Sequence, residues 1–141
     1  MPVGVDAVAL VDTSVAVALS VADHSQHEST HDAIGDRALG LSGHAAFETY
    51  SVLTRLPPPA RRNPQTVARL LAVSFPHTKY LGAAASANLT DELVSAGVAG
   101  GAVYDALVGA AAREHDLPLV TRDQRAAETY RALAVRFELL A

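Results

Sequence analysis

The chain has 141 residues, half of them hydrophobic, which suffices for one globular domain (1–141) and is too little for two. Its 11 basic and 15 acidic residues give a net charge of −4, which excludes a protein that coats nucleic acid through charge alone. Cysteine is absent, which excludes disulfides and thiolate metal sites. Residues 1–6 lack the basic start of a signal peptide and Asp12 interrupts the first apolar run, so we expect a cytosolic protein that does not enter membranes.

The first apolar run, residues 7–11, ends at an acid. This layout predicts a buried strand of a parallel sheet with Asp12 at its carboxyl end. Ser14 is a suitable N-cap residue, and we predict that it starts a helix from Val15 to about Val21. Asp12 would then lie beside a helix amino terminus, where the helix dipole favours negative charge.

Residues 23–39 are more polar and contain three histidines. His24, His27 and His31 follow a spacing that can place a zinc site on one helix face. The segment has no apolar shell and no nearby fourth ligand. We therefore interpret it as a solvated helix face.

A short second strand is predicted at 40–42, followed by a helix over 44–56 that carries Glu48. The proline-rich run after this helix must end it and form a stiff surface loop. That loop carries Arg61 and Arg62. Paired arginines on a loop can contact a phosphate, although simple solvation is the favoured interpretation.

Three further elements are predicted in the middle of the chain. Pro64 can occupy the first turn of a helix that Pro76 ends. A brief third strand is predicted within 77–81, and a helix that stops at Gly97 follows it.

Asp105 is an acid within a helix-forming run, 102–115, that is otherwise small and apolar. An ionised carboxylate on such a face costs several kcal/mol unless a cation compensates it. Its neighbours at helical spacing are Gly101, Ala102, Val108 and Gly109. The residue types around Asp105 therefore point to a bound cation.

The end of the chain repeats the layout of a strand followed by an acid. Residues 119–121 predict a strand that leads to Asp123, and a helix over 124–133 and a last strand over 134–139 follow. Because strands and helices alternate without hairpin signals, we predict an α/β fold, a three-layer α/β/α domain with a mostly parallel sheet of four to five short strands.

Four acids are expected to meet at one edge of this sheet. Asp12 and Asp123 follow strands, and reactive groups of open parallel sheets gather at the carboxyl ends of the strands. Asp105 and Glu48 lie on helices that can line the same edge. Oxygen ligands select Mg²⁺ or Mn²⁺, and such ions support phosphodiester chemistry.

The motifs Leu10-Val-Asp12-Thr-Ser14, Phe47-Glu48, Tyr104-Asp105-Ala-Leu and Leu119-Val-Thr121-Arg-Asp123 occur in this order. Together they resemble the PIN domain, in particular the toxin ribonucleases of VapBC-type toxin–antitoxin pairs. The resemblance implies a metal-dependent endoribonuclease in which Asp12 and Asp105 are the principal Mg²⁺ ligands. Glu48 and Asp123 would complete the acidic quartet directly or through water. Ser14 and Thr121 would hold carboxylates or waters in place.

The resemblance also implies a homodimer, an RNA substrate and a small VapB-like antitoxin whose tail enters the active-site groove. Candidate RNA contacts are Arg55, Arg61, Arg62 and Arg122. Many relatives carry Asn at the position of Asp123, and a second acid and a Phe where this chain has Ala126 and Ala127. This departure leaves open whether one or two metal ions bind.

Two other functions are weighed against this one. The first is a catalytically inert PIN-like module that binds RNA or a protein. The second is a phosphatase that forms an aspartyl-phosphate, since Leu10-Val-Asp12 also resembles its nucleophile strand. That chemistry needs a second Asp at the position of Ser14 and a phosphate-binding lysine, and Lys79, the single lysine, lies in no such motif.

Overall fold

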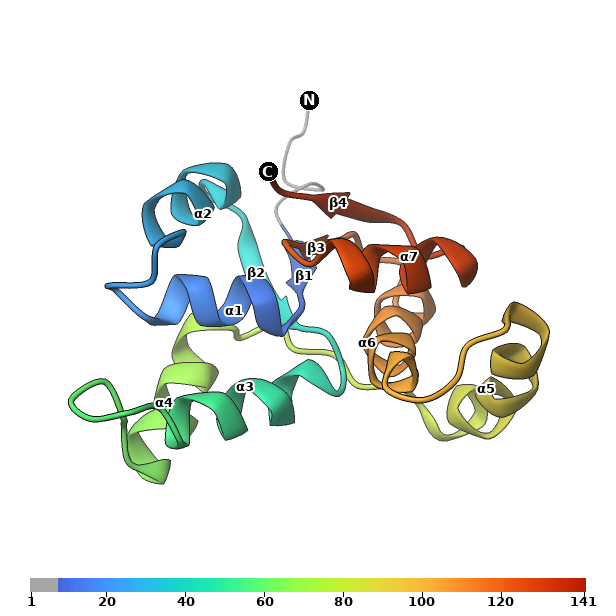
Figure 1. Cartoon of the computed structure of the whole chain (residues 1–141), viewed down its shortest axis with the longest axis horizontal. Helices are drawn as coiled ribbons and strands as arrows, with labels where there is room; N and C mark the ends of the chain where they lie inside the picture. The colour runs from blue at the N-terminus through green and yellow to red at the C-terminus, as the bar shows by residue number, and fades with distance from the viewer. Residues whose placement is uncertain (1–7) are drawn as a thin grey trace.

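The computed structural model describes residues 8–141, so the expected strand start at Ala7 and the segment 1–6 lie outside it. Within this range the chain forms four strands and seven helices (Figure 1). The strands are β1 (Val8–Val11), β2 (Ala38–Leu41), β3 (Leu119–Thr121) and β4 (Phe137–Leu139). The helices are α1 (Thr13–Ser20), α2 (His27–Ile34), α3 (Ala45–Thr54), α4 (Pro64–Ser74), α5 (Ala83–Ala96), α6 (Ala102–Glu114) and α7 (Gln124–Ala132).

All four strands pair in parallel in the order β2-β1-β3-β4. At the end of β1, Val11 lies between Leu41 of β2 and Val120 of β3. Because the strands share one direction, their carboxyl ends meet at one edge of the sheet. The predicted parallel α/β class is confirmed.

The core lies on both faces of the sheet. Successive β1 residues point to opposite faces, so Ala9 and Val11 pack on one side and Leu10 on the other. Helices α1, α2 and α3 and the end of α4 cover the first face, while α6 and α7 cover the second (Figure 1). These layers are the predicted α/β/α arrangement.

Helix α5 lies at the periphery (Figure 1). Leu89 is its one buried residue. Glu92 joins it to α6 through an ion pair with Arg113, in which Nη2 and Oε1 are 2.6 Å apart. Gly97 ends it in the left-handed conformation, with φ of 71°, as the sequence predicted. No helix within residues 8–141 is long and apolar enough to cross a membrane.

The predicted N-cap of α1 is wrong. Asp12 is the N-cap residue, because its Oδ1 accepts a hydrogen bond from the backbone N–H of Val15 at 3.4 Å. Ser14 lies inside the first turn and donates its hydroxyl to the same oxygen at 2.6 Å. Asp and Ser cap helices about equally well, so residue preference alone did not separate them.

The predicted third strand within 77–81 does not form. Only a single bridge, between Ser42 and Lys79, is found there. The backbone N–H of Leu41 donates to the hydroxyl of Thr78 at 2.9 Å. This side chain takes the place of a backbone acceptor, which interrupts the ladder beside β2.

The last predicted strand, 134–139, is shortened to three residues. Ala134 has φ of 56°, and the N–H of Val135 donates to the carbonyl oxygen of Tyr130 at 2.9 Å. These residues therefore complete the turn after α7 instead of pairing with β3. The second strand begins earlier than predicted, at Ala38 instead of residue 40.

Candidate active site

The four predicted acids lie at the amino ends of four helices. Asp12 and Asp123 follow the neighbouring strands β1 and β3 and are the N-cap residues of α1 and α7. Glu48 and Asp105 lie in the first turns of α3 and α6. A helix amino terminus stabilises negative charge, which gives each carboxylate a local reason to be there.

This placement corrects the prediction for Asp105, which was expected within the helix. Helix α6 begins at Ala102, as the sequence predicted, and this start places Asp105 in its first turn rather than in its interior. The helix dipole therefore supplies part of the compensation that the sequence argument assigned to a cation alone.

Asp12 is buried and is held by three hydrogen bonds. Its Oδ1 accepts from the Ser14 hydroxyl at 2.6 Å and from the N–H of Val15, and its Oδ2 accepts from the hydroxyl of Tyr130 at 2.9 Å. Burial raises the pKa of Asp12, and these hydrogen bonds oppose that rise. The carboxylate is thus fixed in one orientation at the end of β1.

Ser14 and Thr121 connect the ends of β1 and β3. The Ser14 hydroxyl accepts a hydrogen bond from the N–H of Arg122 at 2.9 Å and lies 3.5 Å from the hydroxyl oxygen of Thr121. The Thr121 hydroxyl in turn accepts from the N–H of Asp123 at 3.0 Å. Through these bonds the segment after β3 is locked against Asp12.

Tyr130 is a site residue that the sequence prediction missed. It is almost fully buried, 118 positions along the chain from Asp12, and the two are joined only by the fold. Burial and the charge of Asp12 raise the pKa of Tyr130 far above its ordinary value, so its hydroxyl remains a donor. One signal was available: an apolar helix face spaced as Ala126, Ala127 and Tyr130 buries a tyrosine hydroxyl that must find a partner.

Asp105 is half-buried, and its pKa is raised to about 6. Burial is the largest cause, followed by the negative charges of Asp123, Glu48 and Asp12. Arg125 opposes the rise. The charges of the other three acids therefore reach the Asp105 carboxyl group.

The free energy of unfolding of metal-free protein is expected to fall as the pH rises from about 4 to about 6, partly because of Asp105. Its carboxyl ionises near 3.8 ordinarily and at about 6 in the fold, so the unfolded state binds fewer protons in this interval. Asp105→Asn should remove this contribution and stabilise the protein at pH 7 by about 1 kcal/mol, since solvent screening reduces the full effect.

Chemical denaturation in EDTA at pH 4 and pH 7 measures this slope. Asp91→Asn, at an exposed position on α5, is the matched control and should leave the slope unchanged. A clear loss of stability in Asp105→Asn at pH 7 would contradict the expectation and assign Asp105 a structural role.

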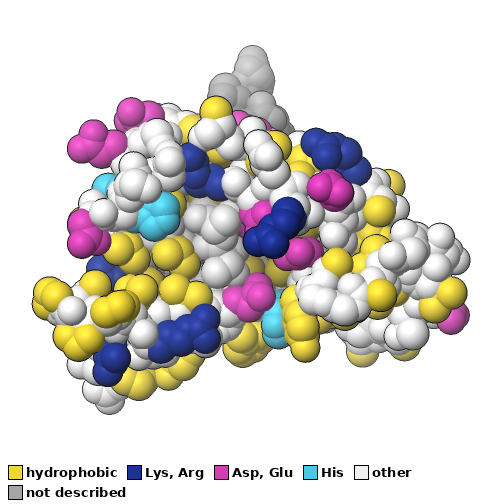
Figure 2. All heavy atoms as spheres, viewed as in Figure 1, with side chains coloured by type: hydrophobic (Ala, Val, Ile, Leu, Met, Phe, Trp, Pro, Cys, Tyr) yellow, Lys and Arg dark blue, Asp and Glu magenta, His cyan; other side chains and the backbone are white. Residues whose placement is uncertain are grey.

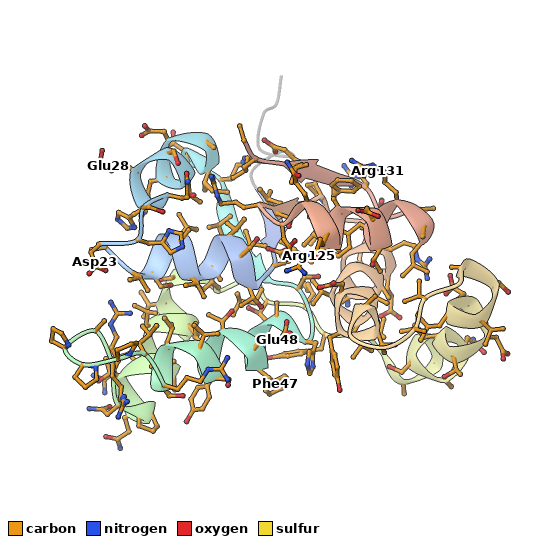
Figure 3. All side chains as sticks on the ribbon, in the orientation of Figure 1. Asp23, Glu28, Phe47, Glu48, Arg125 and Arg131 are labelled. Atoms are coloured by element: carbon orange, nitrogen blue, oxygen red, sulfur yellow. The ribbon has the colours of Figure 1, made fainter. Side chains whose placement is uncertain are left out.

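Glu48 lies in the wall of a surface pocket of about 450 Å³, here called the α3 pocket. Its lining includes Thr13, His44, Phe47, Glu48, Arg55 and Tyr104. The hydroxyl of Thr13 donates to Oε1 of Glu48 at 3.1 Å. Figure 2 shows acidic side chains gathered near the centre of this face beside a basic one, and Figure 3 shows Glu48 and Arg125 there.

The donor set fits a hard divalent cation in charge but does not form a closed cage. The negative charges that raise the pKa of Asp105 are charges that a divalent cation with oxygen ligands, such as Mg²⁺ or Mn²⁺, would compensate. Within residues 8–141, no three His, Asp or Glu side chains are grouped closely enough to hold a metal ion together. An ion held by fewer protein ligands would need water to complete its coordination, and Mg²⁺ usually keeps several waters.

The three histidines of the second segment do not form a zinc site. Nδ1 of His24 accepts from the N–H of Gln26 at 3.0 Å, and Nδ1 of His27 lies 2.8 Å from the carbonyl oxygen of Ala18. The His27 and His31 rings meet edge to face at 4.6 Å. The segment is partly packed against α1, with His31 exposed.

Only one of the four candidate RNA-binding arginines, Arg55, lines the α3 pocket. Arg61 and Arg62 donate to the carbonyl oxygens of Leu56 and Ser20, at 2.8 and 2.9 Å. The guanidinium of Arg122 is used within the fold, where it donates to Gln26 Oε1, Thr30 Oγ1 and the Ala141 oxygen.

A parallel sheet with carboxylates at its carboxyl edge defines an α/β protein with an acidic site at that edge. The PIN domain model matches residues 9–132. The chain is 46% identical to Ribonuclease VapC27 of Mycobacterium tuberculosis over 125 residues, 89% of this chain and 91% of that one. It is 48% identical to Ribonuclease VapC40 of the same species over 130 residues, 92% of this chain and 96% of that one. The chain therefore belongs to the PIN domain family, in the group of the VapC ribonucleases.

Solved structures agree with this fold. VapBC2 from Rickettsia felis, bound to a promoter DNA fragment, aligns with a TM-score of 0.68 at 14% identity, covering 95% of this chain and 99% of that one. VapBC-5 from Mycobacterium tuberculosis aligns with a TM-score of 0.58 at 20% identity, covering 95% and 98%. At these identities the likeness concerns the fold.

Proposed function

We propose that this chain is a Mg²⁺-dependent endoribonuclease and the toxin of a toxin–antitoxin pair. The observation that carries the proposal is that four carboxylates lie at four helix amino termini and that the charges of three of them act on the fourth, Asp105. The names of the two mycobacterial relatives, both ribonucleases, support RNA as the substrate.

In this proposal Asp12 and Asp105 hold the ion, and Glu48 and Asp123 complete its surroundings directly or through water. When bound, Mg²⁺ or Mn²⁺ lowers the pKa of water and neutralises charge on the phosphate. Ser14 and Tyr130 keep the Asp12 carboxylate oriented by their hydrogen bonds. The Thr121 hydroxyl positions Asp123 by accepting a hydrogen bond from the backbone N–H of Asp123.

Purified protein is expected to cleave RNA when Mg²⁺ or Mn²⁺ is supplied and to stop when EDTA is added, because the acids alone carry uncompensated negative charge. Gel analysis of end-labelled RNA measures this, and excess Mg²⁺ should restore cleavage. Unchanged cleavage in EDTA would contradict the metal requirement. No cleavage with either ion would contradict the ribonuclease proposal.

The proposed assembly is a homodimer of a single domain, 1–141, bound by a small VapB-like antitoxin whose tail enters the groove at the acids. The solved structures that share this fold are structures of VapBC toxin–antitoxin proteins, which supports such a partner. A short reading frame beside the gene should relieve growth arrest when it is expressed together with this chain.

An inert PIN-like binding module is the second candidate, favoured by the absence of a closed metal cage within residues 8–141. It predicts RNA binding without cleavage under any metal condition. The aspartyl-phosphate phosphatase has less support, because the position of its second acid is taken by Ser14, whose hydroxyl donates to Asp12.

A further inference from the structure

Arg122 directly precedes Asp123, yet the partners of its side chain lie outside the acidic site. Nη1 donates to the hydroxyl of Thr30 at 3.1 Å, and Nη2 donates to Oε1 of Gln26 at 2.7 Å and to the Ala141 oxygen at 2.6 Å. Among residues 8–141 this guanidinium forms no ion pair with an aspartate or a glutamate. Its donors are therefore used to join separate segments of the fold and not to neutralise the acids.

The acceptors on the α2 side are arranged for this guanidinium. Thr30 is completely buried, and the bond from Arg122 is the one hydrogen bond of its side chain within residues 8–141. A buried hydroxyl that loses its partner destabilises the fold, because it has given up water without a replacement. Gln26, the residue before α2, does not cap the helix with its side chain and accepts from Arg122 instead. Arg122 thus fixes the first turn of α2 to the segment after β3.

The backbone of the same residue reaches the acids. β3 ends at Thr121, and beyond it the N–H of Arg122 donates to the Ser14 hydroxyl at 2.9 Å. Ser14 in turn donates to Oδ1 of Asp12 at 2.6 Å. The next N–H, that of Asp123, donates to Oγ1 of Thr121 at 3.0 Å. One residue therefore has its side chain bonded to α2 and its backbone bonded to the network of Asp12, so a displacement of Arg122 reaches two acids.

We infer that Arg122 is a positioning residue whose guanidinium holds the segment that carries Asp123 and keeps Ser14 bonded to Asp12. The three bonds of the guanidinium are here called the Arg122 anchor. The inference rests on the proposed function and deepens it, because it makes the geometry of the acids depend on α2, a helix that carries none of them. An arginine that contacted RNA instead would act through its charge, which a lysine would also supply.

Amide hydrogen exchange measured by NMR in EDTA tests the Arg122 anchor without metal or RNA. Arg122→Met removes the guanidinium and keeps an unbranched side chain, whereas Thr30→Val removes the hydroxyl and keeps the shape. The N–H groups of residues 122 and 123 should exchange about tenfold faster in Arg122→Met and about threefold faster in Thr30→Val, because local opening becomes easier. The double variant should exchange no faster than Arg122→Met, since both changes remove the same bond. Wild-type exchange in both single variants would overturn the inference.

Calorimetric titration with Mn²⁺ and steady-state RNA cleavage give two further readouts. Arg122→Met should bind Mn²⁺ about tenfold more weakly, as is typical when a residue that orients metal ligands is lost. Its kcat should fall about tenfold while KM for RNA stays within about twofold, because the residue does not bind the substrate. Arg122→Lys should resemble Arg122→Met, since a single ammonium cannot span these separate acceptors. A raised KM that Arg122→Lys restores would overturn the inference in favour of a phosphate contact.

Arg37→Met is the matched control, because Arg37 also makes three hydrogen bonds at α2. Nε and Nη2 donate to the carbonyl oxygens of Ile34 and Ala33 at 3.2 and 3.0 Å, and Nη1 donates to Oε1 of Glu138 on β4 at 3.0 Å. These bonds join the other end of α2 to β4 and do not include the acids of the site. Exchange at residues 122 and 123, Mn²⁺ affinity and kcat should stay within about twofold of the wild type. Losses equal to those of Arg122→Met would show a general loosening of α2 and overturn the inference.

The exchange readout does not depend on catalysis, and thermal melts verify that every variant is folded. If the wild type neither binds Mn²⁺ nor cleaves RNA while exchange rises as expected, the proposed enzyme fails and the Arg122 anchor stands. If the wild type cleaves RNA with Mg²⁺ and the Arg122 and Thr30 variants match its exchange and Mn²⁺ affinity, the Arg122 anchor fails alone.

Discussion

Asp12→Asn is expected to reduce RNA cleavage at least about 100-fold, because this residue is the most constrained oxygen donor of the site. Three hydrogen bonds fix its carboxylate at the end of β1, between the elements that carry Ser14 and Tyr130. Replacing one carboxylate oxygen by an amide removes a negative charge where a cation is proposed and leaves the shape of the side chain almost unchanged. Single-turnover cleavage with saturating Mg²⁺ measures the effect.

Asp23→Asn, at an exposed position beyond α1, provides the control for loss of one negative charge and should cleave at the wild-type rate. Melting curves of both variants in EDTA exclude unfolding as the cause. Asp12→Asn retaining more than about a tenth of the wild-type rate would remove Asp12 from the proposed metal site.

Gly40→Ala is expected to give the largest loss of stability among single methyl additions, on the order of 3 kcal/mol or more. A Cβ at Gly40 would lie 2.2 Å from both the carbonyl carbon and the carbonyl oxygen of His77. These are backbone atoms, so no side-chain rotation relieves the clash. The segment after α4 would have to move away from β2, where the His77 N–H donates to Leu39 at 3.1 Å.

Thermal melting and the yield of folded protein measure this effect. Gly101→Ala is the matched control, because a Cβ at Gly101 meets nothing within 4 Å and its φ is −61°. Equal melting temperatures for Gly40→Ala and the wild type would show that the contact beside β2 yields easily.

Three of the four acids could be placed in the fold from the sequence because each follows a local rule. Asp12 and Asp123 end short apolar runs, and strands that end in this way meet at one sheet edge when they are parallel. Asp105 was found because its neighbours are too small and apolar to explain a charge. These signals lie within a few residues of the acid itself.

What escaped prediction depends on contacts between distant segments. Tyr130 reaches Asp12 across 118 positions, and no local pattern specifies that partner. The Thr78 hydroxyl that replaces a backbone acceptor beside β2 likewise depends on tertiary packing. The start of α6 at Ala102 was predicted correctly, but the residue types around Asp105 did not reveal that it lies in the first turn of that helix.

The hydrogen bond between Tyr130 and Asp12 ties the assembly of the site to the order in which the chain is made. Asp12 leaves the ribosome well before Tyr130, which follows it by 118 positions in the chain. A nascent chain that ends before β3 therefore lacks one acid and the hydroxyl that orients another. The four carboxylates reach their native positions only after the segment through Tyr130 has been made, which separates the assembly of the proposed nuclease site in time from the synthesis of its first acid.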